Sequence, residues 1–327
     1  MAKYDFICMG NAIVDIITMC SEDFLQEQQL AKGQMNLVDQ ARFRSLYAQL
    51  QTTLQVPGGS AANTAVALAN LGAKVGFIGK TAHDNLGLDF VKDLHKNRVE
   101  SLLPCLGHET PSSSSIIYIT EDGERTMATY LGISHDMQIQ DIPLDEILRC
   151  EYLLVESYLL DIPACKSILA SLLPQAEKEE IQVILTITDK ACVKRHVEFI
   201  QTLLPSVSIV FGKEEVFKML LGVEEHDAIE NSIHNAKQLM IMTGKSGAWV
   251  VENQEKQFKP RQNTRIIDRT AADDIFIAGF MTAYKDNKNT ALCMEFARKV
   301  SEDAMKVFGG RLQTLEGAWQ NYRNLVD

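Results

Sequence analysis

The stretch Asp268-Arg269-Thr270-Ala271-Ala272-Asp273-Asp274-Ile275-Phe276-Ile277-Ala278-Gly279-Phe280 joins two local patterns. The apolar pair before it, Ile266-Ile267, indicates the end of a strand, and the apolar periodicity of 275–284 predicts a helix. A strand, a small-residue turn and a helix start form an anion site, because first-turn N–H groups are unpaired and the helix dipole favours negative charge. A carboxylate beside such a site can take a proton from a hydroxyl while a phosphate lies on the amides.

The same alternation of strand and helix runs through the preceding half of the chain. Regular alternation predicts an α/β fold with a doubly wound, mostly parallel sheet, whose ligands bind beyond the carboxyl ends of the strands. We expect one domain over residues 1–327, ending in a hairpin over 248–258 and helices over 290–308 and 316–326. The expected strands are 4–9, 152–156, 182–188, 207–211 and 238–243, and the helices between the later ones are 163–179, 193–204, 213–221 and 228–237.

Composition limits the class of protein. The 327 residues are 46% apolar and 23% charged, which is typical of a globular chain with a sizeable core. A net charge of −11 argues against a nucleic-acid partner. No apolar run reaches transmembrane length, and the first residues lack a signal peptide pattern, so we expect no membrane partner. The seven cysteines lack CxxC spacing and indicate reduced thiols of a cytoplasmic protein, and the histidines lack zinc-site spacing.

Two glycine-containing stretches follow early strands. Gly10-Asn11 and Asp15 come after the strand over 4–9, where an Asx turn at a polar strand end explains them without any ligand. Pro57-Gly58-Gly59-Ser60-Ala61-Ala62-Asn63 leads into a helix expected over 66–71. A plain strand-to-helix turn with Ser60 as N-cap explains this stretch too. The paired glycines nevertheless allow close approach of another backbone or a ligand.

The strands over 112–120 and 125–130 interrupt the alternation. Asp122-Gly123 between them is a hairpin turn, so Arg125 is either a solvated hairpin residue or a site residue.

The stretch Gly244-Lys245-Ser246 resembles the end of a Walker A motif. That motif requires a glycine five residues earlier, where this chain has Leu239, so the interpretation fails.

These motifs together resemble the ribokinase and adenosine kinase-like (PfkB) carbohydrate kinases. The opening stretch is similar to the second family signature, Asp-Thr-x-Gly-Ala-Gly-Asp-x-Phe, at Asp268, Asp274 and Phe276, whereas Ala271-Ala272-Asp273 replaces Gly-Ala-Gly. The stretch 58–65 matches the first signature, Gly-Gly-Ser-x-x-Asn-x-Ala, and the match continues through 71–79 and 84–87. The resemblance spans nearly the whole chain and implies a ribokinase-like fold. Its small β-strand lid is expected at about residues 16–38 and 104–131.

The resemblance implies a role for each matched residue. Asp274 is the implied catalytic base, Arg125 lies near the transferred phosphate, and backbone amides of Ala271-Ala272-Asp273 form the anion hole. The implied substrate ligands are Asn11, Asp15, Gly58, Gly59 and Asn63. A carboxylate such as Asp15 suits sugar hydroxyls because it accepts two charge-assisted hydrogen bonds at once.

The nucleotide motifs are less complete. In the family's Asn-x-x-Glu motif the glutamate is matched by Glu215, which the resemblance gives a magnesium role through water, but the asparagine is Gly212. In Thr-x-Gly-x-x-Gly, Gly244 and Gly247 match while Met242 replaces the threonine. The implied cofactors are ATP and Mg²⁺, with a monovalent cation as a further family ligand.

Two functions follow from the resemblance. The first is an ATP-dependent kinase acting on a primary hydroxyl of an adenosine-like ribonucleoside or a sugar, as a monomer or homodimer. The second is a non-catalytic protein that binds a nucleoside or sugar on the same fold. The substitutions at Gly212, Met242, Ala271 and Asp273 all fall in the phosphate half, which keeps this alternative open, whereas Asp274, Glu215 and Arg125 favour the kinase.

Overall fold

A computed structural model describes residues 2–51, 53–105, 109–224, 238–244, 246–252, 255–262, 271–306, 315 and 317–326. The helix expected over 228–237, the residues Asp268, Arg269 and Thr270, and Lys245 lie outside the described residues. Among the residues described, no helix is long and apolar enough to cross a membrane. All seven cysteines are free thiols.

Nine strands of the described chain form the large sheet, in the order β14-β13-β12-β11-β10-β9-β1-β5-β6. The strands from β12 to β6 pair in parallel, while β13 and β14 extend the edge in antiparallel fashion. The mostly parallel sheet predicted from the sequence is therefore confirmed. The strands are β1 (Tyr4–Met9), β5 (Val75–Ile78), β6 (Val99–Ser101), β9 (Cys150–Glu156), β10 (Gln182–Ile187), β11 (Ile209–Lys213), β12 (Leu239–Thr243), β13 (Gly247–Glu252) and β14 (Glu255–Pro260).

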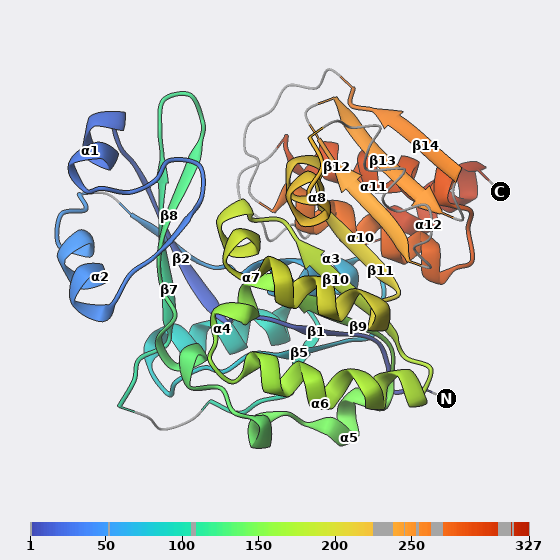
Figure 1. Ribbon diagram of the computed structural model, residues 1–327, viewed down its shortest axis with the longest axis horizontal. Coiled ribbons are helices and arrows are strands. Elements are labelled where there is room, and N and C mark those ends of the chain that lie inside the picture. The colour runs from blue at the N-terminus through green and yellow to red at the C-terminus, as the bar shows by residue number, and fades with distance from the viewer. Residues whose placement is uncertain are drawn as a thin grey trace.

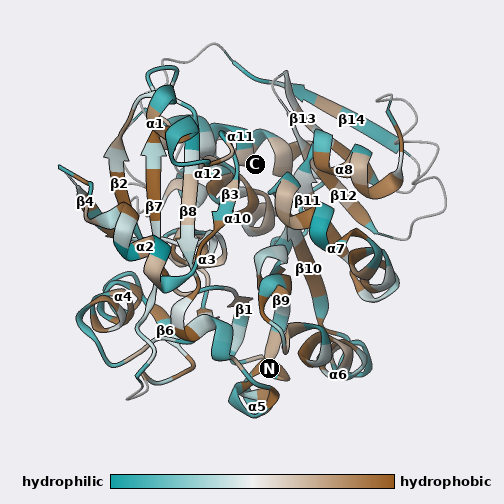
Figure 2. Cartoon of the chain, turned by 60° about the vertical axis from the view of Figure 1, so that its left-hand side comes forward, coloured by the Kyte–Doolittle hydropathy of each residue, from teal (hydrophilic) through white to brown (hydrophobic). Residues whose placement is uncertain are grey.

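Helices cover both faces of this sheet, so its central strands are apolar on both sides. In β10, Ile184 packs on one face, whereas Val183 and Leu185 pack on the other. Figure 2 shows β10 and β12 as hydrophobic and the edge strand β14 as mostly hydrophilic. One layer contains α3 (Ser60–Asn70), α4 (Asn85–Lys96), α10 (Ala272–Lys285), α11 (Thr290–Ala304) and α12 (Ala318–Val326); the other contains α6 (Cys165–Lys178), α7 (Lys190–Leu203) and α8 (Glu214–Leu221).

A second sheet stands beside the large one (Figure 1). Within the part of the chain that the structure describes, five strands form it, in the order β3-β8-β7-β2-β4. Helices α1 (Glu22–Glu27) and α2 (Gln40–Tyr47) pack on it around a small core that contains Ile16 and Tyr118. The strands are β2 (Ile13–Met19), β3 (Met35–Leu37), β4 (Leu54–Pro57), β7 (Ser113–Ile119) and β8 (Arg125–Tyr130).

The second sheet is larger than the expected lid, because β4 and the start of β2 lie outside 16–38 and 104–131. The sequence does not predict β3, because a strand of three residues is too short to show an alternating pattern within a polar segment. The helix expected over 66–71 instead begins at Ser60, directly after Gly59. Gly59 is the N-cap and has a φ of 84°, a left-handed conformation that glycine adopts without strain. Ser60 is therefore the first helical residue and not the N-cap.

The remaining elements connect the layers. A short helix, α5 (Leu144–Ile147), precedes β9. The described residues also form four 3₁₀ turns, η1 (Gly132–Asp136), η2 (Ile139–Asp141), η3 (Ser157–Asp161) and η4 (Leu204–Ser206). The turn η3 follows β9 directly, so it begins at the carboxyl edge of the large sheet, where the sequence predicts that ligands bind.

Candidate active site between helices α3 and α10

The first turns of α3 and α10 meet at the side chain of Asp274. Ser60 Oγ donates a hydrogen bond to Asp274 Oδ1 at 2.7 Å, and Asn63 Nδ2 donates to Oδ2 at 3.0 Å. Both donors come from the first glycine-rich stretch, which lies more than two hundred positions earlier in the chain. The two signatures identified in the sequence therefore form one hydrogen-bonded group.

Asp274 is buried, with 7% of its surface exposed. Burial raises the pKa of Asp274 to about 6, against the two hydrogen bonds from Ser60 and Asn63, which favour the ionised form. The neighbouring Asp273 raises the pKa further, whereas the positive charge of Arg125 lowers it. A carboxylate of this kind is ionised at neutral pH and is still basic enough to accept a proton.

The turn before α10 holds a strained alanine. Ala271 is the N-cap of α10 and has φ 57° and ψ 15°, in the left-handed region that residues with a Cβ rarely adopt. Ala272 is the first helical residue, so its N–H and that of Asp273 belong to the unpaired first turn. The Asp273 side chain accepts a hydrogen bond from Thr243 Oγ1 at 3.2 Å, which holds it toward the end of β12.

The glycine pair between β4 and α3 allows very close approach of neighbouring groups. A Cβ on Gly58 would lie 2.2 Å from Asp15 Oδ2, and a Cβ on Gly59 would lie 2.6 Å from the carbonyl oxygen of Asn11. Any larger residue would displace the Asp15 carboxylate or the Asn11 backbone. The structure thus brings Asp15 against Gly58 and Asn11 against Gly59, and Asn63, in the first turn of the helix that follows, bonds Asp274.

Glu156, the last residue of β9, lies at the centre of this arrangement. Its Oε1 accepts a hydrogen bond from the backbone N–H of Asn11 and its Oε2 accepts one from that of Ala61, both at 2.7 Å. Burial raises the pKa of Glu156 to about 7, and the negative charge of Asp274 contributes to that rise. One carboxylate therefore joins the turn after β1 to the start of α3.

Arg125 begins β8 in the second sheet and is partly buried. Its positive charge acts on the Asp274 carboxyl and lowers its pKa, so this strand of the second sheet lies near the start of α10. Its Nε is buried without a hydrogen-bond partner among the described residues. A buried guanidinium N–H without a partner is a donor available to an anionic ligand.

The sequence-predicted nucleotide residues follow β11 and β12. Gly244 comes directly after β12, and its N–H donates to the carbonyl oxygen of Gly247 at 2.8 Å, which closes a tight turn into β13. Glu215 is exposed in the first turn of α8. Glu215 therefore belongs to the helix layer that covers the face of the large sheet opposite to α3 and α10.

Comparison with known proteins identifies the family. The model described as pfkB family carbohydrate kinase matches residues 33–314. The chain belongs to this carbohydrate kinase family. The match covers both signatures together with the second sheet from β3 onward. Named relatives in this family are sugar and nucleoside kinases, so the chain is a sugar or nucleoside kinase by family.

Solved structures confirm the ribokinase-like fold. An adenosine kinase from Sinorhizobium meliloti has a TM-score of 0.93 with 30% sequence identity, and the match covers 98% of this chain and 100% of that one. A probable sugar kinase from Rhizobium etli CFN 42 also has a TM-score of 0.93 with 30% identity, over 98% and 99% of the chains. The ribokinase of Staphylococcus aureus (strain COL) is 23% identical over 291 residues, covering 84% of this chain and 92% of the relative.

Sequence reasoning missed two residues of this kinase-family site. Ser60 belongs to the first signature, but the sequence predicts only a possible N-cap role for it, whereas its hydroxyl donates a hydrogen bond to Asp274. For Glu156 the sequence predicts only the last position of the strand over 152–156. A signal for Glu156 was present, since a carboxylate that closes a buried apolar strand needs partners to offset its desolvation.

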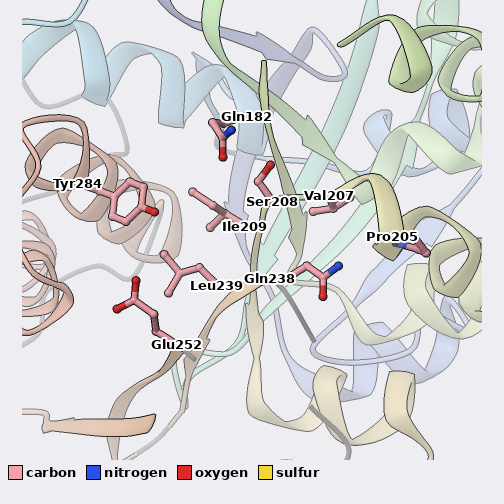
Figure 3. Close-up of a pocket in the computed structure, with 9 residues that line it drawn as sticks. All are labelled: Gln182, Pro205, Val207, Ser208, Ile209, Gln238, Leu239, Glu252 and Tyr284. Atoms are coloured by element: carbon pink, nitrogen blue, oxygen red, sulfur yellow. The ribbon is translucent and has the colours of Figure 1, made fainter. Parts of the chain in front are cut away.

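A separate pocket lies at the opposite edge of the large sheet (Figure 3). Its volume is about 300 Å³, and Gln182, Ser208 and Gln238 line it at or just before the first residues of β10, β11 and β12. Asp274 and the glycine turns lie at the carboxyl ends of the strands instead. The pocket therefore does not belong to the site that the two signatures form.

Proposed function

We propose that this chain is an ATP-dependent phosphotransferase that acts on a primary hydroxyl of an adenosine-like ribonucleoside or of a sugar. The observation that carries the proposal is the buried carboxylate of Asp274, which the first signature holds through Ser60 and Asn63 at the start of α10. This arrangement aims a base at the region where Asp15 and the glycine pair would bind the acceptor.

Asp274 acts as the base in this proposal. It accepts the proton of the acceptor hydroxyl as that oxygen attacks the terminal phosphate of ATP. The pKa of about 6 supports this role, because the ionised form predominates at neutral pH while the driving force for proton transfer stays favourable. Ser60 and Asn63 fix the orientation of the carboxylate, so that the oxygens face the acceptor in a defined direction.

The developing charge on the phosphoryl group is stabilised from two sides. The first-turn N–H groups of Ala272 and Asp273, with the turn at Ala271, supply backbone donors and the positive end of the α10 dipole. Arg125 supplies a guanidinium from the second sheet, and its Nε has no competing partner in the described part of the chain. Gly244 and Gly247 shape the turn that would accommodate the nucleotide.

Of the family's Asn-x-x-Glu magnesium motif, this chain keeps only the glutamate, Glu215. Glu215 is an exposed carboxylate in the first turn of α8, and this donor type holds Mg²⁺ through coordinated waters. When bound, the metal would neutralise phosphate charge. The family asparagine is absent at Gly212, where a Cβ would lie 2.6 Å from Ile187 Cγ1 and 2.7 Å from its carbonyl oxygen, so a larger residue would not fit there.

Acceptor-dependent ADP formation tests this function. The purified chain is incubated with ATP and Mg²⁺ and with adenosine, other ribonucleosides, ribose or fructose in turn, and any product is identified by ³¹P NMR. 5′-Deoxyadenosine, which lacks the primary hydroxyl, is the matched control for adenosine. Turnover with at least one acceptor, and none with its deoxy control, is the expected result.

A binding measurement distinguishes an inactive chain from an untested acceptor. Ligands that bind the native state raise the unfolding temperature whether or not transfer occurs. Asp15→Ala is expected to abolish this stabilisation by the acceptor while the fold persists. Stabilisation by an acceptor without any product would favour a non-catalytic binding protein and would contradict the kinase.

A further inference from the structure

Asp189 joins helix α7 to the second sheet. It is the N-cap of α7, where its Oδ1 accepts a hydrogen bond from the backbone N–H of Cys192 at 2.7 Å. Its Oδ2 accepts a second hydrogen bond, at 3.3 Å, from the backbone N–H of Met35 in β3. Both Asp189 and Met35 are 6% exposed. One buried carboxylate thus holds the edge strand of the second sheet against the large α/β unit.

Strand β3 is in turn tied to the part of β8 that carries Arg125. Met35 pairs with Met127, and the N–H of Met127 donates to the carbonyl oxygen of Gln34 at 3.1 Å. The N–H of Gly33 donates to Thr126 Oγ1 at 3.0 Å. Arg125 lies directly before Thr126 and Met127 in β8, so a displacement of β3 would move Arg125 as well.

Helix α7 is a fixed base for this contact. Arg195 Nε and Nη2 donate to the two oxygens of Asp161 in η3, at 2.9 and 2.6 Å, and His196 Nε2 lies 2.8 Å from Oδ1. The ligand atoms of Asp161, Cys192 and His196 lie within 4.8 Å of one another, a spacing that a metal ion could bridge. Arg195 already pairs with both oxygens of Asp161, so we interpret the group as an ion-pair anchor for α7.

We propose that Asp189 is a positioning residue that holds Arg125 near Asp274 by clasping β3 to the start of α7. The role rests on the proposed kinase function, whereas the clasp itself is measurable without any turnover. Removing the clasp frees the β3–β8 edge and moves the guanidinium away from the phosphoryl group. Asp189 touches neither substrate nor phosphate in this proposal.

Amide hydrogen exchange tests the clasp in the full-length protein without ligands. Asp189→Ser keeps a good N-cap oxygen but lacks the second acceptor, and Asp189→Asn replaces one acceptor with an amide donor. Exchange in the segment 33–37 is expected to rise about tenfold in both variants, as for loss of a hydrogen bond to a charged group. The segment 191–196 is expected to stay protected. Asp39→Ser, the same change at the N-cap of α2, is the matched control and should leave both segments unchanged.

Two exchange results would overturn the proposal. The first is an unchanged rate in 33–37 for both Asp189 variants. The second is an equal rise in 33–37 and 191–196, since this pattern reports loss of the α7 cap and not of the clasp.

A double-mutant cycle tests the coupling to Arg125. Asp189→Ser is expected to lower kcat about tenfold in the parent protein, with less effect on the acceptor KM, and to have no further effect in an Arg125→Ala background. An equal loss in both backgrounds would contradict a role through Arg125. A parent protein without turnover would fail the proposed kinase function, and hydrogen exchange alone would then decide whether the clasp exists.

Discussion

Helices α3 and α10 both follow an N-cap residue with a positive φ, but the two N-caps differ in residue type and in ψ, which is 129° at Gly59 and 15° at Ala271. Gly59 precedes α3 with a φ of 84°, and Ala271 precedes α10 with a φ of 57°. At Gly59 a Cβ would collide with the Asn11 carbonyl oxygen at 2.6 Å, so glycine is required for space as well as for conformation. At Ala271 the Cβ is tolerated, and the left-handed backbone alone costs about 1–2 kcal/mol.

The difference shows which half of the site has kept its close packing. The substrate half, which contains the residues expected to bind the acceptor, retains glycine at positions where Asp15, Asn11 and Glu156 leave no space for a Cβ. The phosphate half has replaced glycine at a position where strain is the cost and a collision is not. Because Ser60 and Asn63 still bind Asp274, the strained turn remains attached to the intact one.

Breaking the intact half is expected to have the largest effect. Gly59→Ala combines left-handed strain with the 2.6 Å collision and should lower the free energy of unfolding by roughly 3 kcal/mol or more. Gly123→Ala is the matched control, since Gly123 has a φ of 78° and no atom within 4 Å of an added Cβ, and it should cost roughly 1 kcal/mol. Urea denaturation measures both. Equal losses would show that space at Gly59 does not matter.

The pH dependence of turnover probes the charges around Asp274. Activity needs the ionised base, so kcat/KM should rise with pH through an apparent pKa of about 6. Asp273→Asn removes a negative charge that raises this pKa, and the acidic limb should therefore move to lower pH. A limb that stays in place, or moves to higher pH, would contradict the assignment of Asp274 as the titrating base.

The same groups affect stability with a defined sign. The folded state raises the pKa of Asp274 from 3.8 to about 6 and that of Glu156 from 4.5 to about 7. Both carboxyls thus hold protons more tightly when folded. The stability that these two carboxyls contribute to the folded state is fully present below their unfolded-state pKa values. It is lost as the pH rises through their folded-state pKa values of about 6 and about 7.

Asp273 tests whether charge weakens the phosphate half. Its carboxylate lies beside the proposed anion hole, and its Thr243 hydrogen bond does not remove the charge. After solvent screening, loss of this charge should strengthen ATP–Mg²⁺ binding by about 1 kcal/mol, or roughly fivefold. Asp273 has no positive φ, unlike Ala271, so Asp273→Asn and Asp273→Gly should gain alike. A gain in the glycine variant alone, measured by calorimetry, would indicate backbone geometry instead.

Restoring glycine at Ala271 is expected to have the smallest effect. Ala271→Gly removes about 1–2 kcal/mol of left-handed strain but adds about 0.5–1 kcal/mol of unfolded-state entropy. The net gain in unfolding free energy should be of order 0.5–1 kcal/mol, opposite in sign to Gly59→Ala. A loss of stability in this variant would show that the alanine methyl packs favourably enough to outweigh the strain.

Strong local patterns made the fold predictable from the sequence. The structure contains the predicted strands over 4–9 and 125–130 and most of the predicted later alternation of strands and helices. These elements are predictable because buried strands and amphipathic helices have characteristic spacings of apolar residues. The three-residue strand β3 was missed, since its pairing with β8 depends on tertiary contacts and not on local pattern.

The candidate site was predictable where the two signatures carried it. The signatures identify Asp274 and Asn63 separately, but the hydrogen bond between them depends on the packing of α3 against α10. Ser60 and Asp189 have roles that depend on partners far away in the chain, and no local spacing indicates them. At Glu156 the end of a buried apolar strand indicates that the carboxylate needs partners, but not which residues they are.

The most direct test of the account compares phosphoryl transfer by the parent chain and by Asp274→Asn at pH about 8, where the base is ionised. Asparagine keeps the shape but cannot accept the proton, so turnover should fall by roughly 10²–10⁴-fold while acceptor binding, followed by thermal stabilisation, persists. Asp273→Asn, the same change one residue earlier, should retain turnover. Equal turnover in the parent and in Asp274→Asn would contradict the account.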